Sequence, residues 1–78
     1  MAVAALILHL DPARADTTVE RLAQHPALTL GAPQGLLLPV AVESSDARSG
    51  MALVEEIQAT PGVAFIDVVM IDFSDEGV

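Results

Sequence analysis

The chain has 78 residues, 53% of them hydrophobic, with no cysteine, and eleven acidic residues against three arginines give a formal net charge of −8. This composition excludes a disordered chain, a disulfide framework and a thiolate metal site. The negative charge repels phosphate backbones and anionic lipids, which argues against nucleic acid as a partner. The charge would attract a basic peptide or would serve only solubility, and both alternatives stay open. The length suits one domain spanning residues 1–78.

The N-terminal stretch is apolar, MAVAALILHL, and could be mistaken for a secretory signal. It lacks the positively charged segment that such a signal needs, and no apolar run in the chain approaches the roughly 20 residues of a membrane span. We therefore expect an N-terminal strand, no membrane insertion and a cytoplasmic location.

The first predicted strand, Val3 to Leu10, leads into a helix that has two alternative starting points. Asp11 and Pro12 would serve as an N-cap and a first-turn proline. Asp16 or Thr17 would instead cap a later start. The sequence leaves both starts open.

The first predicted helix is amphipathic and ends near His25, because Pro26 disfavours helical geometry in the residue before it. Its predicted inward positions are Ala15, Val19, Leu22 and Ala23. Such a helix needs a sheet or another helix to cover its apolar side.

A hairpin follows the first helix. Ala27 to Leu30 supplies a short second strand, and the turn residues from Gly31 to Gly35 connect it to an antiparallel third strand, Leu36 to Glu43. Pro39 lies inside that strand, where a missing amide is costly, so we expect a bulge or an early strand break there.

The second predicted helix is capped within the Ser-Ser-Asp segment at residues 44–46 and ends at Pro61-Gly62. Its predicted inward positions are Met51, Leu53, Val54 and Ile57. The last strand runs from Val63 to about Phe73, and residues 74–78 form a polar tail that we expect to fray.

The two halves of the chain repeat at an offset of 35 residues, from Asp11 to Asp46. The other matches are Val19 with Val54, Glu20 with Glu55, Leu22 with Ile57, and Pro26 with Pro61. Two strand-helix-strand halves joined by a hairpin predict a ferredoxin-like βαββαβ fold of the α+β class. In that fold a four-stranded antiparallel sheet carries both helices on one face and leaves the other face open.

The last strand contributes the most informative part of that open face. Asp67 lies in mid-strand and cannot sit unpaired under the helices. Strand parity then points Phe65, Asp67, Val69 and Ile71 outward, and Ala64, Ile66, Val68 and Met70 toward the core. An apolar row with one carboxylate predicts a peptide-docking surface, and homodimerisation through the same face is the alternative.

The chain offers few residues for catalysis or metal binding. His9 and His25 are the only histidines, and neither has a second ligand at a metal-binding spacing, so we predict no metal and no cofactor. His9 could line the open face, but we assign it no function. Adjacent Glu55 and Glu56 diverge by about 100° on a helix and form a solvated face. Phosphate-binding, serine-hydrolase and zinc-protease motifs are absent, and we predict a protein that is not an enzyme.

Several of these features together resemble the NapD family. They are the helix end Leu22-Ala-Gln-His-Pro26, the turn residue Gly35, the strand end Val42-Glu43, and Thr60-Pro-Gly-Val63 before the final strand. The resemblance spans nearly the whole chain. Members of this family are small cytoplasmic chaperones for periplasmic nitrate reductase, and their fold is ferredoxin-like.

The resemblance implies binding of the twin-arginine signal peptide of a molybdenum-containing oxidoreductase on the sheet, which holds back export during cofactor insertion. Two arginines followed by an apolar stretch suit an acidic domain with an apolar open sheet. Asp67 and Glu43 are the candidates for arginine contacts. Phe65, Val69 and Ile71 are the candidates for the apolar stretch. Strand parity, and not a family motif, supplies these assignments.

The chain departs from the family pattern at two places. Ala27 stands where many relatives have a glycine after the proline, and Met70-Ile71 stands where relatives have a tyrosine-histidine ending. The client is therefore either periplasmic nitrate reductase or a related exported molybdoenzyme. We expect a monomer or a weak homodimer, and the alternative function is a dimeric ferredoxin-like regulatory or ligand-binding module.

Overall fold

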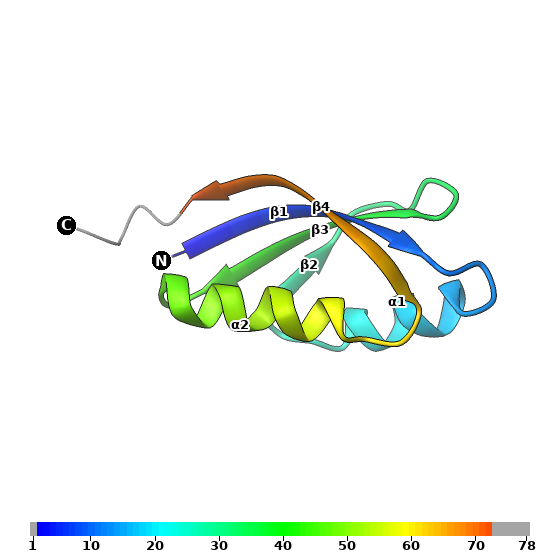
Figure 1. The fold of residues 1–78 in the computed structure, drawn as a ribbon, viewed down its shortest axis with the longest axis horizontal. Helices are drawn as coiled ribbons and strands as arrows, with labels where there is room; N and C mark the ends of the chain where they lie inside the picture. The colour runs from blue at the N-terminus through cyan, green and yellow to red at the C-terminus, as the bar shows by residue number, and fades with distance from the viewer. Residues whose placement is uncertain (1, 73–78) are drawn as a thin grey trace.

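A computed structural model describes residues 2–72, which form the element order βαββαβ. The strands are β1 (Ala2–Leu10), β2 (Leu28–Leu30), β3 (Leu37–Ser44) and β4 (Val63–Asp72), and the helices are α1 (Ala15–Ala23) and α2 (Ala47–Gln58). The sheet has the order β2-β3-β1-β4, and all neighbouring strands are antiparallel. Both helices lie on one side of it (Figure 1). The predicted ferredoxin-like α+β fold is confirmed, whereas Phe73 and the predicted tail at 74–78 lie outside the described residues.

The hydrophobic core lies between the sheet and the two helices. Every second residue of β1 is buried along the whole strand, so one face of this central strand meets the helices. Leu6 and Leu8 are fully buried there, in one cluster with Leu22 of α1 and Ile57 of α2. Each such side chain contributes about 1.5–3 kcal/mol when fully buried. The alternate residues of β1 therefore belong to the opposite, open face.

Helix α1 begins at Ala15, so both predicted starts are wrong. Arg14 occupies the N-cap position without a side-chain hydrogen bond. Asp11 closes a turn instead of capping the helix, because its Oδ1 accepts from the backbone N–H of Ala13 at 3.0 Å. The Asp11 N–H donates to the carbonyl of Gly62 at 2.8 Å, which ties this turn to the start of β4.

Helix α2 begins at Ala47 and is capped by Asp46, one of the three predicted candidates Ser44, Ser45 and Asp46. The backbone N–H of Ser49 donates to Asp46 Oδ1 at 2.8 Å. This hydrogen bond, followed by one from the Ser49 side chain, lowers the pKa of Asp46 below its ordinary value. The buried face of α2 runs through Gly50 and Ile57, and Met51 is exposed rather than inward as predicted.

Pro39 does not interrupt β3, so the predicted bulge or strand break is wrong. The register with β1 is regular through this position, where Pro39 lies opposite Ile7. The Pro39 carbonyl accepts from Gly31 N at 2.8 Å, so its backbone polar groups point toward the β2 side. β2 ends at Leu30, and the missing amide therefore costs no hydrogen bond to β1.

Strand β4 is irregular where the sequence predicts simple alternation. Its register with β1 shifts once between Ala5 and Leu6 and again between His9 and Leu10. The first shift leaves Val69 as an extra residue, and the second leaves Ala64 unpaired and exposed. The parity predicted for the last strand therefore fails beyond Val69, and the prediction that Ala64 faces the core is also wrong.

Because of the first register shift, Met70 and Ile71 lie on the faces of the sheet opposite to those predicted for them. Ile71 lies opposite Ala4, a buried residue of the helix-covered face, and Met70 lies opposite Ala5 of the open face. Directly opposed residues of antiparallel strands share a face. The assignment of Ile71 to the open face is therefore wrong, and Met70 takes its place.

Candidate functional site

The open face is the surface of the sheet opposite the helices. The strand pairing assigns to it Val3, Ala5, Ile7 and His9 of β1, Leu37, Pro39, Ala41 and Glu43 of β3, Thr29 of β2, and Phe65, Asp67, Val69, Met70 and Asp72 of β4. Four of the five predicted site residues belong to this face, namely Phe65, Asp67, Val69 and Glu43. Ile71 does not.

A shallow apolar depression of about 330 Å³ occupies the middle of the open face. Ala5 lies opposite Ala41, and Ala41 lies opposite Thr29, so three short side chains run across three strands. Longer side chains, including Ile7 and Val69, line the depression around these three short side chains. Val69 is 64% exposed, so most of its apolar surface is in contact with solvent.

A small cluster on the open face joins β1 to β4. His9 Nε2 lies 2.8 Å from Asp67 Oδ2, and the His9 ring meets the Phe65 ring edge-on with centroids 5.2 Å apart. Phe65 is 57% exposed in spite of this contact. The sequence prediction gave His9 no role, and the signal that would have found it is the pairing of His9 with Phe65 across the two strands.

The end of the open face near Val3 is acidic. Glu43 of β3 and Asp72 of β4 both lie opposite Val3, so their side chains flank it on the same face. Neither side chain has a hydrogen bond or ion pair in the part of the chain that the structure describes. Asp72 was not predicted, because its place depends on the bulge at Val69. Four residues of strand separate this end from the row of Ile7 and Asp67, a distance of about 13 Å.

His25, the second histidine, serves a structural purpose away from the open face. Its Nδ1 accepts from the backbone N–H of Ala27 at 3.1 Å, and its Nε2 lies 3.4 Å from Glu56 Oε2. These contacts connect the end of α1 to α2. Within residues 2–72, no group of three or more His, Cys, Asp or Glu side chains is arranged to hold a metal ion. No helix in this range has the length and apolar character needed to cross a membrane.

These features define a ferredoxin-like domain with an open sheet face that is apolar in its middle and acidic at one end. The chain is similar in structure to the E. coli Tat proofreading chaperone protein NapD, whose solution structure it matches with a TM-score of 0.80 at 19% sequence identity. The match covers 97% of this chain and 82% of that chain. No protein-family model matches the sequence, and no curated protein matches it either. At 19% identity, the likeness shows a common fold.

Proposed function

We propose that this protein is a non-catalytic cytoplasmic chaperone that binds the twin-arginine signal peptide of an exported molybdoenzyme on its open face. Binding would hold back export while the client enzyme receives its cofactor, and the client would be periplasmic nitrate reductase or a related oxidoreductase. One observation carries the proposal: an apolar depression and two carboxylates that have no partner among residues 2–72 share one face of the sheet. The structural likeness to a Tat proofreading chaperone supports it.

The layout of the open face suits a peptide with arginines at one end and apolar residues after them. Glu43 and Asp72 would accept hydrogen bonds from the guanidinium groups, which favour bidentate pairs with carboxylates. The apolar segment would then cover the depression and the exposed side chains of Val69 and Phe65. The span of about 13 Å corresponds to about nine residues of helix or four of extended chain.

The three carboxylates would contribute unequally. Asp67 already has a partner in His9 at 2.8 Å, and an incoming arginine would have to compete with that imidazole. Glu43 and Asp72 have no such competitor among the described residues. We therefore assign the stronger arginine contact to the acidic end and a weaker one to Asp67.

Self-association through the open face is less favourable than peptide binding. Two copies that met there would bring together surfaces bearing Glu43, Asp67 and Asp72, and each chain carries a formal charge of −8. Like charges placed against one another across an interface oppose association. The proposal therefore includes a monomer or at most a weak homodimer.

Charge-reversal variants test the proposed site. Glu43→Lys and Asp67→Lys would be compared with Glu55→Lys, which changes an exposed acid of α2 away from the open face. Affinity for a labelled twin-arginine signal peptide would be measured by fluorescence anisotropy, with circular dichroism to confirm folding. A charged hydrogen bond is worth about 1.5–3 kcal/mol, so Glu43→Lys should weaken binding by about 10-fold or more.

The matched control decides how this result is interpreted. Under the proposal, Glu55→Lys changes the affinity by less than about threefold, because it alters only the net charge. Equal weakening by all three variants would mean that the peptide responds to overall charge and not to the open face. Unfolding of Asp67→Lys would contradict the exposed position of that carboxylate.

A further inference from the structure

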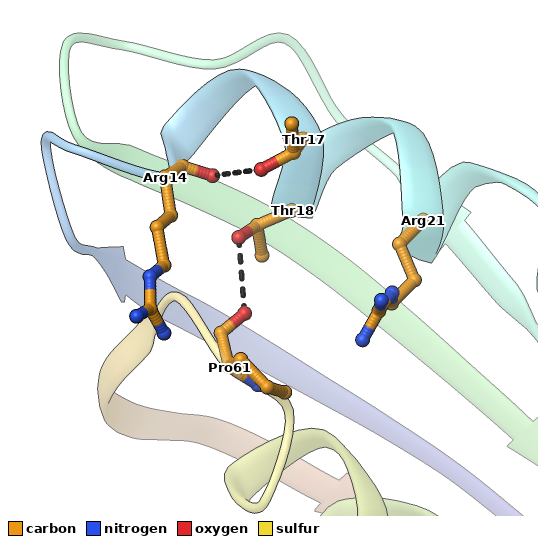
Figure 2. A pocket seen from close by; sticks show the side chains of 5 residues that line it. All are labelled: Arg14, Thr17, Thr18, Arg21 and Pro61. Atoms are coloured by element: carbon orange, nitrogen blue, oxygen red, sulfur yellow. Dashed lines mark hydrogen bonds between the residues drawn. The ribbon is translucent and has the colours of Figure 1, made fainter.

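Helix α1 separates its positive and negative side chains onto different stripes. Arg14, Thr17, Thr18 and Arg21 follow one another at helical spacing and, together with Pro61, line a pocket of about 260 Å³ (Figure 2). Asp16 and Glu20 lie on another stripe and line a separate pocket with Pro33 and Gly35. Two of the three arginines of the chain thus share a pocket that no acidic side chain among the described residues lines.

Within residues 2–72, the two guanidinium groups have no partners. In the region that the structure describes, neither the Arg14 nor the Arg21 side chain forms a hydrogen bond or an ion pair, although the chain contains eleven acidic residues. Both side chains extend from the α1 segment toward the side of the Pro61 turn (Figure 2). Their positive charge is therefore available to an external anion.

The walls of this pocket are fixed by hydrogen bonds. Buried Thr18 donates from Oγ1 to the carbonyl of Pro61 at 3.2 Å, and Thr17 donates from Oγ1 to the carbonyl of Arg14 at 3.1 Å. Gly62, with φ of 97°, turns the chain beside Thr18. Because these contacts hold the α2–β4 turn against α1, the pocket exists before any ligand arrives.

We infer that this pocket binds a small phosphate-bearing anion, a phosphate ester or diphosphate, through Arg14 and Arg21. The two arginines are seven residues apart, about 10 Å along the helix axis, and their long side chains reach a group placed between them. Guanidinium groups pair with phosphate oxygens in bidentate geometry. The volume of about 260 Å³ lies below the range of roughly 300–1,000 Å³ for drug-sized ligands, which favours a small anion over a polypeptide segment.

This site is independent of the proposed function. The pocket is formed by α1 and the α2–β4 turn, on the helix side of the sheet, whereas the peptide surface is the open face. A phosphate-bearing ligand and a signal peptide could therefore be bound at the same time. A chain that binds the signal peptide but not the anion would contradict only the anion site. A chain that binds the anion but not the signal peptide would contradict only the proposed function.

The test uses the complete chain and titrations with pyrophosphate and with inorganic phosphate, followed by ¹⁵N NMR. Saturable shifts are expected in the amides of residues 14–21, Thr60 and Gly62, with pyrophosphate binding more tightly because it offers oxygens to both arginines. Arg14→Gln and Arg21→Gln should each weaken pyrophosphate binding by about fivefold or more. Arg48→Gln, which removes the same charge from α2, should change it by less than about twofold.

Three results would overturn the inference. The first is amide shifts that do not saturate with pyrophosphate. The second is a loss of pyrophosphate affinity in Arg48→Gln as large as that in Arg14→Gln or Arg21→Gln. The third is tighter binding of tetraglutamate than of pyrophosphate. The last would mean that the pocket accepts an acidic peptide. Signal-peptide affinity, measured on the same variants, should not fall when Arg14 or Arg21 is replaced.

Discussion

Gly62→Ala is the substitution for which the structure gives the most specific prediction. Gly62 has φ of 97°, a conformation that L side chains rarely adopt, and an added Cβ would overlap the Oγ1 atom of Thr18. The left-handed backbone costs about 1–2 kcal/mol. Displacing Thr18 would break its hydrogen bond to Pro61 and leave a buried hydroxyl without a partner, at a cost of about 1–2 kcal/mol more. We therefore expect a loss of about 2–4 kcal/mol from a total stability of roughly 4–12 kcal/mol.

Gly35→Ala is the matched control for this change. Gly35 also has a positive φ, 62°, but an added Cβ there would meet no atom within 4 Å. Gly35→Ala should therefore lower the free energy of unfolding only by the cost of the left-handed backbone, about 1–2 kcal/mol. The difference between the two glycine variants reports the close approach of Gly62 to Thr18 and Arg14.

Urea unfolding followed by circular dichroism would measure these free energies, with Thr18→Ala and the double variant Thr18→Ala/Gly62→Ala completing a cycle. Without the Thr18 hydroxyl, Gly62→Ala should cost less than it does in the otherwise unchanged chain, although its Cβ would still lie 3.1 Å from Thr18 Cβ and 3.2 Å from Arg14 Cβ. A Gly62→Ala variant that loses no more stability than Gly35→Ala in the otherwise unchanged chain would refute the contact with Thr18.

Three further predictions concern stability. Ile57→Ala should cost about 2–5 kcal/mol in urea unfolding because the side chain is 2% exposed, whereas Val68→Ala, at 51% exposure, should cost less than about 1.5 kcal/mol. Pro39→Ala should change the free energy of unfolding by less than about 1 kcal/mol, and a larger loss would contradict the placement of its missing amide. Because the backbone N–H of Ser49 lowers the pKa of Asp46 in the folded chain, that carboxylate stabilises above its unfolded pKa and loses this effect as pH falls through the lowered folded pKa. Asp46→Ala should therefore flatten the fall in melting temperature at acid pH, and an unchanged profile would contradict the cap.

The element order and the fold could be predicted because both depend on local patterns. The short apolar run from Val3 to Leu10 predicts a strand, and the Ser-Ser-Asp segment at residues 44–46 predicts the start of a helix. Two strand-helix-strand halves joined by a hairpin leave few other ways to cover the apolar helix faces. The start of α1 was mispredicted because the Asp11 carboxylate binds a backbone N–H in either a cap or a turn, and its contact with Gly62 is not local.

The face of each residue near the end of β4 could not be predicted. Val68-Val69-Met70-Ile71 is a continuous apolar run, so no polar residue marks which side chains face outward. The bulge at Val69 then moves Ile71 to the helix side and brings Asp72 to the open face. His9 was missed for a related reason, because its partners Phe65 and Asp67 lie far away in sequence and only the register between β1 and β4 brings them together.

The central claim is that the open face recognises a basic, apolar peptide. Calorimetric titration of the chain with a synthetic twin-arginine signal peptide, and with the same peptide carrying glutamine at both arginine positions, tests it most directly. We expect saturable binding that weakens at least about 10-fold on loss of the arginines and that weakens with added salt. The same affinity for both peptides, or no binding to any twin-arginine signal, would contradict it.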